Sequence, residues 1–186
     1  MSLLINLRLL RLALISLLIA FLCLSACSKP DRSQKDLPKI LNIGILPDET
    51  SEELLKRYTP LFTHISKELG IPYKLIIPKD YANLIHEFSL GNIDLAYFGG
   101  FTFLQANLLY GATPLVMRDI DVNFTSYFFT SPNQSSKALT DFAGARLSFG
   151  SKLSTSGHLM PRFFLQENGI DPEKHFDTII YSGSHD

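Results

Sequence analysis

The sequence contains few cysteines and no tryptophan; its two thiols, Cys23 and Cys27, both lie in the N-terminal stretch. Residues beyond Cys27 can therefore form neither a disulfide nor a cysteine metal site. The histidines His64, His86 and His175 lack the spacing of metal ligands and lie on amphipathic or loop stretches, so we predict that they are solvated. We expect no metal and no cofactor.

Positive charge is also not in excess. The formal net charge is −1, and the loss of Arg8 and Arg11 with a cleaved leader would make it more negative. A nucleic-acid-binding domain needs a basic face, so we expect no nucleic-acid partner. Nucleotide-binding loops are absent too, because residues 150–157 lack the Gly-Lys-Ser/Thr ending of a P-loop and no Gly-x-Gly-x-x-Gly occurs.

Charged residues are missing from residues 12–27, an apolar run that follows the basic start of the chain. A basic start, such a run and small residues at its end are typical of a secretory signal peptide. The run is short for a permanent transmembrane helix, which needs about 20 apolar residues. We therefore predict that this segment directs export and is no part of the fold.

The end of the run, Leu24-Ser25-Ala26-Cys27, resembles the lipobox of bacterial lipoproteins. That resemblance implies a signal peptide at 1–26 and a lipid on Cys27; an ordinary signal peptide with an incidental cysteine is the alternative. Residues 27–39 are mostly polar, include two prolines, and are predicted to be a tether. We expect a lipid-anchored protein on the periplasmic or extracytoplasmic face of the cell membrane.

Beyond residue 40, short apolar runs alternate with longer amphipathic segments. The apolar runs predict strands at 41–46, 73–77, 94–98, 114–117, 126–130, 145–149 and 178–181. The amphipathic segments predict helices at 51–69, 80–90, 100–109, 138–143 and 158–168. Strands that alternate with helices favour an α/β fold with a largely parallel sheet. Pro60 inside the first helix predicts a kink or a restart there.

A polar loop at 131–137 precedes a second series of strands and helices. We predict a first α/β lobe at 40–124 and a second at 125–186. The chain stops directly after an apolar strand, and an α/β layer needs further strands and a covering helix. We therefore expect the second lobe to be incomplete and the chain to be a fragment.

The segment S-T-S-G-H-L-M-P, residues 154–161, places three hydroxyl side chains before a predicted helix. Pro161 has no N–H and belongs in a first turn, which starts the helix near His158. Backbone N–H groups before that turn are not bonded by the helix, and with the hydroxyls they suit a tetrahedral oxyanion. The alternative is a simple helix cap, for which one hydroxyl is enough.

Four segments carry a resemblance to a known family: PKDYANLI at 78–85, IDLAYFGG at 93–100, STSG at 154–157 and SGSHD at 182–186. In this order and spacing they resemble the periplasmic phosphate/phosphite/phosphonate-binding family of ABC importers, and the likeness extends over residues 40–186. It implies two lobes of the type II periplasmic-binding-protein fold with a ligand cleft between them. It also implies delivery of an oxyanion to a permease and its ATPase, with no chemical change to the ligand.

The same resemblance implies roles for individual residues. Ser154, Thr155 and Ser156 match the serine-threonine-serine that holds phosphonate oxygens. His185 matches a histidine that reaches the same group, and Tyr81 matches a first-lobe tyrosine that faces the cleft. Phe124 stands where another ligand-facing tyrosine is expected, so one hydrogen bond is missing or the alignment shifts there. Whether phosphonate, phosphite or phosphate is bound stays open.

Several of these residues also have simpler explanations. Tyr81 taken alone fits a rim aromatic, and His185 fits a surface histidine. Tyr97 and Phe98 continue an apolar strand and are predicted to be core. Asp48 and Glu49 follow the first strand, where α/β crevices bind ligands, and could contact the cationic end of a ligand; charged loop residues with no specific role are the alternative.

Two other classes of protein need weighing. Ser156, His185 and Asp186 suggest a hydrolase, but the Gly-x-Ser-x-Gly elbow that presents a nucleophilic serine is missing. In addition, an aspartate directly next to a histidine in sequence does not place its carboxylate where it could orient the histidine ring. We therefore expect no enzyme. An extracytoplasmic sensor for the same anion is the second alternative, although it would carry another transmembrane segment and a cytoplasmic part. We predict a monomeric substrate-binding component of an ABC importer.

Overall fold

The computed structural model describes residues 38–135 and 138–185. The predicted signal peptide at 1–26, Cys27 and nearly all of the predicted tether lie outside these residues, as does Asp186. Within the described part of the chain, no helix is both long enough and apolar enough to span a bilayer.

A three-stranded parallel sheet forms the first half of the described chain. Its strands are β1 (Leu41–Ile45), β2 (Tyr73–Ile76) and β3 (Leu95–Tyr97), and their order is β2-β1-β3. Ile43 pairs with Leu75 on one side and with Leu95 on the other. The central strand β1 is therefore the most buried of the three.

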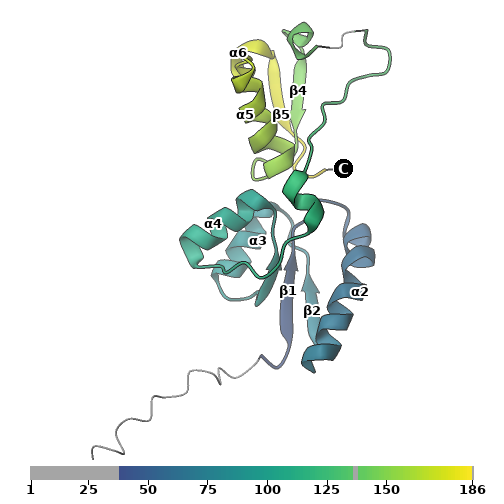
Figure 1. The fold of residues 1–186 in the computed structure, drawn as a ribbon, viewed down its shortest axis with the longest axis vertical. Coiled ribbons are helices and arrows are strands. Elements are labelled where there is room, and N and C mark those ends of the chain that lie inside the picture. The colour runs from purple at the N-terminus through teal and green to yellow at the C-terminus, as the bar shows by residue number, and fades with distance from the viewer. Residues whose placement is uncertain (1–37, 136–137, 186) are drawn as a thin grey trace, which may run out of the picture. The chain divides into compact units, whose positions relative to one another are not determined.

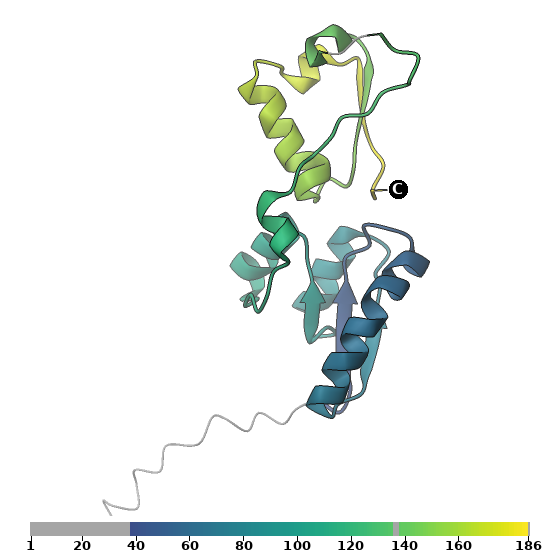
Figure 2. The same cartoon turned by 45° about the vertical axis from the view of Figure 1, so that its right-hand side comes forward.

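Helices cover both faces of this sheet (Figure 1). Helix α2 (Ser51–Leu69) packs Leu54, Tyr58 and Phe62 against β1; these residues recur every four positions, so they share one helix face. Helices α3 (Tyr81–Ser89) and α4 (Gly100–Tyr110) lie on the side away from α2, as Figure 2 also shows. The α/β class predicted from the alternation is confirmed.

Local capping explains where α2 and α3 begin and end. The Thr50 hydroxyl accepts a hydrogen bond from the N–H of Glu53, and Gly70 ends α2 in the left-handed conformation with φ 68°. The carboxylate of Asp80 caps α3 by accepting from the N–H of Asn83 at 2.8 Å. Helix α2 runs through Pro60 without a restart, because core contacts on both sides of the proline hold the two halves in place.

A second, two-stranded sheet follows. Strands β4 (Arg146–Phe149) and β5 (Thr178–Tyr181) are parallel, and they are connected through α5 (Met160–Glu167) and α6 (Pro172–His175). Their core consists of Phe149, Leu165, Ile170 and Phe176. Two 3-10 helices, η1 (Asp119–Asn123) and η2 (Leu139–Phe142), and a π-helical turn, η3 (Thr155–Leu159), complete the described chain.

Two predicted strands, 114–117 and 126–130, are wrong: neither segment forms a strand or joins either sheet of the described residues. Their apolar side chains face solvent, with Val116 94% and Phe129 91% exposed. A strand requires a hydrogen-bonded neighbour, and apolar composition alone does not supply one.

Two smaller predictions also need correction, and one short helix was not predicted. The predicted helix at 138–143 is the 3-10 helix η2, and α6 was not predicted. His175 is half-buried rather than solvated, and its Nε2 lies 3.2 Å from the carbonyl oxygen of Leu139. His64 and His86 are exposed as expected.

Candidate functional site

The carboxyl ends of four strands lead into the segments that carry the predicted site residues. In parallel α/β sheets these ends form the crevice in which ligands bind. The chain runs from β1 to Asp48, from β3 to the start of α4, from β4 to Ser154 and from β5 to His185. A hydrogen bond of 3.0 Å from the N–H of His185 to the carbonyl oxygen of Asp48 joins two of these segments.

Ser154 is the cap of the turn that follows β4. Its hydroxyl accepts a hydrogen bond of 2.9 Å from the N–H of Gly157 and lies 3.1 Å from Nε2 of His185. The residue is 3% exposed. Because a hydroxyl that accepts through one lone pair still has its own proton to give, Ser154 can donate to an oxyanion or to His185.

Pro161 explains why this turn is a π-helix instead of the start of a regular α-helix. The ring nitrogen has no hydrogen, so the carbonyl of Gly157, four residues earlier, receives no helical hydrogen bond from it. That carbonyl accepts from the N–H of Gly150 at 2.8 Å instead. The neighbouring bonds span five residues, as in the 3.0 Å bond from the N–H of Leu159 to the carbonyl of Ser154. The helical region therefore begins at Thr155, earlier than the predicted start near His158.

Thr155 connects this turn to the start of α4. Its hydroxyl accepts a hydrogen bond of 2.7 Å from the N–H of Phe101. Gly100 makes this contact possible, since a Cβ there would lie 3.2 Å from Oγ1 of Thr155. Like Ser154, Thr155 uses a lone pair on a backbone N–H and keeps its proton for another acceptor.

The third hydroxyl, that of Ser156, makes no hydrogen bond within the described residues, while the Ser156 carbonyl accepts from the hydroxyl of Ser126 at 2.7 Å. Only one of the three hydroxyls thus serves as the helix cap. Phe124, where the resemblance calls for a tyrosine, is 55% exposed at the end of η1.

Tyr81 lies at the first position of α3 and is 2% exposed. Its hydroxyl is buried but makes no hydrogen bond of normal geometry. Burial raises the pKa of Tyr81 to about 12, and the negative charge of Asp48 adds to the rise, although the nearby Ser154 acts in the opposite direction. The phenol is therefore a neutral donor at physiological pH.

Among the described residues, which do not include Asp186, no hydrogen-bonded Ser-His-Asp arrangement occurs. His185 lies next to Ser154 and not next to Ser156, which the hydrolase alternative requires. The Ser154 hydroxyl already caps a helix in a buried position, and Asp48 makes no side-chain hydrogen bond to His185. Sequence analysis missed the pairing of Thr155 with Phe101 and assigned Asp48 only a possible contact with the cationic end of a ligand.

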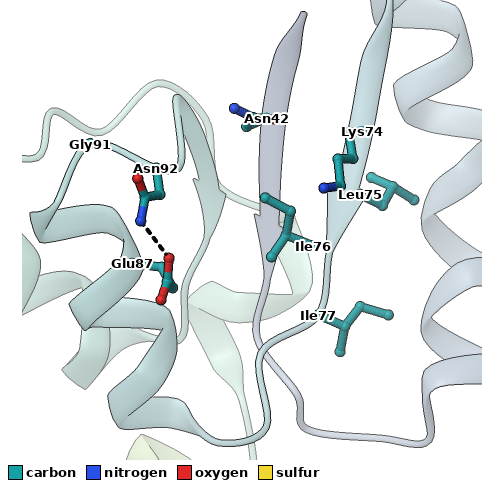
Figure 3. A pocket seen from close by; sticks show the side chains of 8 residues that line it. All are labelled: Asn42, Lys74, Leu75, Ile76, Ile77, Glu87, Gly91 and Asn92. Carbon is teal, nitrogen blue, oxygen red and sulfur yellow. Dashed lines mark hydrogen bonds between the residues drawn. The ribbon is translucent and has the colours of Figure 1, made fainter.

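Elsewhere on residues 38–135 and 138–185, no group of His, Cys, Asp or Glu side chains is arranged to hold a metal ion. A separate open pocket lies between β2 and the carboxyl end of α3 (Figure 3). Two hydrogen bonds lie at this pocket: the Asn92 amide donates to Glu87 at 2.8 Å, and the N–H of Asn42 donates to Asp94.

Known proteins resemble this chain over most of its length. A family model described as "ABC transporter, phosphonate, periplasmic substrate-binding protein" matches residues 43–186. "Probable ABC transporter phosphite binding protein PhnD1" of Prochlorococcus marinus is 35% identical over 161 residues, covering 80% of this chain and 53% of that protein. "Phosphate-import protein PhnD" of Mycolicibacterium smegmatis is 32% identical over 179 residues, covering 87% of this chain and 56% of that protein.

Solved structures agree with this result. PhnD1 from Prochlorococcus marinus in complex with methylphosphonate matches with a TM-score of 0.66 and 31% identity, over 80% of this chain and 58% of that one. A binding protein component of an ABC phosphonate transporter from Pseudomonas aeruginosa matches with a TM-score of 0.58 over 78% of this chain and 51% of that one. Its identity of 24% supports the fold alone.

The fold is that of an α/β periplasmic binding protein. Within that class, the chain belongs to the phosphonate periplasmic substrate-binding protein family of ABC transporters. It spans about half the length of the curated relatives that it matches.

Proposed function

We propose that this chain is the substrate-binding component of an ABC importer and captures a phosphonate, phosphite or phosphate for transport. Binding leaves the ligand chemically unchanged. The partners are a membrane permease and its ATPase, and the protein works as a monomer.

One observation carries the proposal: Ser154 and Thr155 each accept a hydrogen bond from a backbone N–H, at 2.9 and 2.7 Å, and so keep a hydroxyl proton to donate. A tetrahedral oxyanion accepts several hydrogen bonds at once and suits such a group of donors. The similarity to a relative solved with methylphosphonate supports the same ligand class.

In this proposal Ser154, Thr155 and Ser156 donate to the anion oxygens through hydroxyls and through free backbone N–H groups of the turn. His185 contributes a ring N–H, and its contact with Ser154 orients both side chains. Tyr81 donates its phenol, which burial keeps protonated. The lobe boundaries at 40–124 and 125–186 remain a prediction.

The N-terminal stretch completes the proposal. Residues 1–26 act as a signal peptide, Cys27 carries the lipid, and residues 27–39 link the lipid to the folded part. A substrate-binding protein must remain near its permease, and a lipid on Cys27 would keep the protein at the membrane that holds the permease.

Calorimetric titration tests the proposed function. Methylphosphonate, phosphite and phosphate are titrated separately into the full chain at neutral pH, with chloride at the same ionic strength as the control. We expect saturable binding of at least one of the three, at one ligand per chain, and none of chloride. If none of the three binds, the proposal is wrong.

A further inference from the structure

Two buried side-chain atoms in the described part of the chain have no hydrogen-bond partner: Oδ1 of Asp48 and the hydroxyl of Tyr81. Buried polar atoms are nearly always satisfied, because an unmade hydrogen bond leaves the cost of desolvation uncompensated. Both residues adjoin residues of the proposed anion site: the carbonyl oxygen of Asp48 accepts from the N–H of His185 at 3.0 Å, and the charge of Asp48 and the side chain of Ser154 both act on the Tyr81 phenol. We therefore place the two atoms beside that site.

The two atoms differ in what they need. A phenol can donate to an oxyanion, so Tyr81 suits the proposed ligand directly. An ionised carboxylate only accepts, and beside a fully ionised oxyanion it would be repelled by the like charge. Asp48 is therefore compatible with an oxyanion only if a proton lies between the carboxylate and one ligand oxygen.

We propose that Asp48 is a specificity-determining residue that selects oxyanions carrying an acidic proton, and this inference rests on the proposed oxyanion site. Phosphonates, phosphite and phosphate have an ionisation near neutral pH and can keep such a proton. Sulfonates and sulfate have none at that pH. Asp48 thereby separates phosphorus oxyanions from sulfur oxyanions of the same shape and size.

The proton balance of binding follows from this role. A monoprotonated phosphonate brings the shared proton with it, so binding takes up none from solvent. A fully ionised phosphonate, present at higher pH, takes up one proton from solvent as it binds, and that proton stays between Asp48 and the ligand. Burial raises the pKa of Asp48, so uptake is easier than at an exposed carboxylate.

Other titratable groups surround Asp48 and enter the pH dependence. They are Glu49 in the same loop, Arg57 and Tyr58 on α2, Tyr81 on α3 and His185 after β5. Arg57 is paired with Glu49 at 2.7 Å and stays charged throughout, and both phenols stay neutral.

The test compares methylphosphonate with methanesulfonate, which has the same shape but no acidic proton. Both are titrated into the unmutated full chain and into Asp48→Asn, from pH 6 to 9, in buffers of different ionisation enthalpy that report proton uptake. Asn keeps the shape of Asp and can donate to either ligand. Glu49→Gln is the matched control, because it removes the neighbouring negative charge outside the site. Asp48→Ser is a second variant in case Asn alters folding.

We expect the unmutated chain to bind methylphosphonate about a hundredfold or more tightly than methanesulfonate at neutral pH. A site whose carboxylate accepts a hydrogen bond from the ligand's proton is left with an unpaired acceptor when the ligand has no such proton. Asp48→Asn and Asp48→Ser should reduce this preference at least about tenfold and abolish the uptake of the shared proton. Glu49→Gln should change neither.

An unchanged preference and unchanged proton uptake in both Asp48 variants would overturn the inference while leaving the proposed function intact. If the unmutated chain bound no phosphorus oxyanion at all, the proposed function would fail and this inference with it. Equal affinity of the unmutated chain for methanesulfonate and methylphosphonate would also overturn the inference.

Discussion

The hydroxyl of Thr155 accepts a hydrogen bond of 2.7 Å from the backbone N–H of Phe101, which lies 54 positions earlier in the chain. This bond joins the start of α4 to the turn that holds the hydroxyls proposed to bind the anion. Thr155→Val keeps the side-chain shape but leaves that N–H without an acceptor. We expect the free energy of unfolding to fall by about 1–3 kcal/mol, measured by urea denaturation.

Two further variants make this prediction specific. Thr155→Ser keeps the hydroxyl and should lose much less stability than Thr155→Val. Thr113→Val, at an exposed position, is the control: it shows how much a Thr-to-Val substitution alone changes stability. If Thr155→Val is as stable as the Thr113 variant, the bond to Phe101 contributes nothing.

Gly157 leaves room for the contact between Ser154 and His185. A Cβ at this position would lie 3.0 Å from Oγ of Ser154 and 3.4 Å from Nε2 of His185. Gly157→Ala should therefore separate the two side chains, lower stability by about 1–3 kcal/mol and weaken anion binding. Nuclear magnetic resonance of the His185 ring and a denaturation curve report the two effects; an unchanged ring signal would show that the turn adapts without cost.

Asp48 should make stability depend on pH in the absence of ligand. Burial raises its pKa in the folded protein above the ordinary 3.8, so the folded state holds the proton more tightly than the unfolded state. The stability that this proton contributes is complete below 3.8 and is lost as the pH rises through the folded-state pKa. Asp48→Asn should therefore be more stable than the unmutated chain at pH 7, and the advantage should shrink toward pH 4. Melting temperatures across this range measure it, and an advantage that grows on acidification would contradict the assigned direction of the shift.

Membrane attachment should depend on Cys27. Cys27→Ser removes the predicted site of lipidation, and each buried CH₂ of a lipid contributes about 0.8 kcal/mol to membrane binding. We expect this variant to appear in the soluble fraction after cell fractionation, or to keep its leader uncleaved. Cys23→Ser, inside the predicted leader, should behave as the unmutated chain does. Retention of a processed Cys27→Ser chain on membranes would contradict lipid anchoring.

Local patterns were sufficient to predict much of the fold. Helix α2 follows from a run of apolar residues at helical spacing between Thr50 and Gly70, and β1 follows from a short apolar run. These elements are determined by residues close in sequence. The strand predictions for 114–117 and 126–130 were wrong because a strand depends on a hydrogen-bonded neighbour, and the apolar pattern of one segment does not reveal whether such a neighbour exists.

The site was less accessible to sequence analysis than the fold. The hydroxyls of Ser154, Thr155 and Ser156 before a predicted helix already suggested an anion site, whereas Tyr81 and His185 came from the resemblance alone. The structure brings Ser154 next to His185 from 31 positions away. The π-helical turn follows from Pro161, yet its consequence, the bond from Gly150 to the freed carbonyl of Gly157, needs the folded geometry. The importance of Asp48 lies in its buried, unpaired oxygen, and burial of a single loop residue leaves no mark in the sequence.

The central claim is that three adjacent hydroxyls and one histidine bind an oxyanion, and one set of titrations tests it most directly. Methylphosphonate, phosphite and phosphate are titrated calorimetrically into the full chain and into Ser154→Ala, Thr155→Ala, Ser156→Ala and His185→Ala, with melting temperatures taken alongside. A hydrogen bond to a charged group is worth about 1.5–3 kcal/mol, so each variant should bind roughly ten to a hundred times more weakly. Ser156→Ala is the clearest case, because the Ser156 hydroxyl makes no hydrogen bond to any described residue. Removal of this hydroxyl should therefore leave the melting temperature unchanged. If all four variants bind as tightly as the unmutated chain, or if affinity falls only in proportion to stability, these residues are not the site.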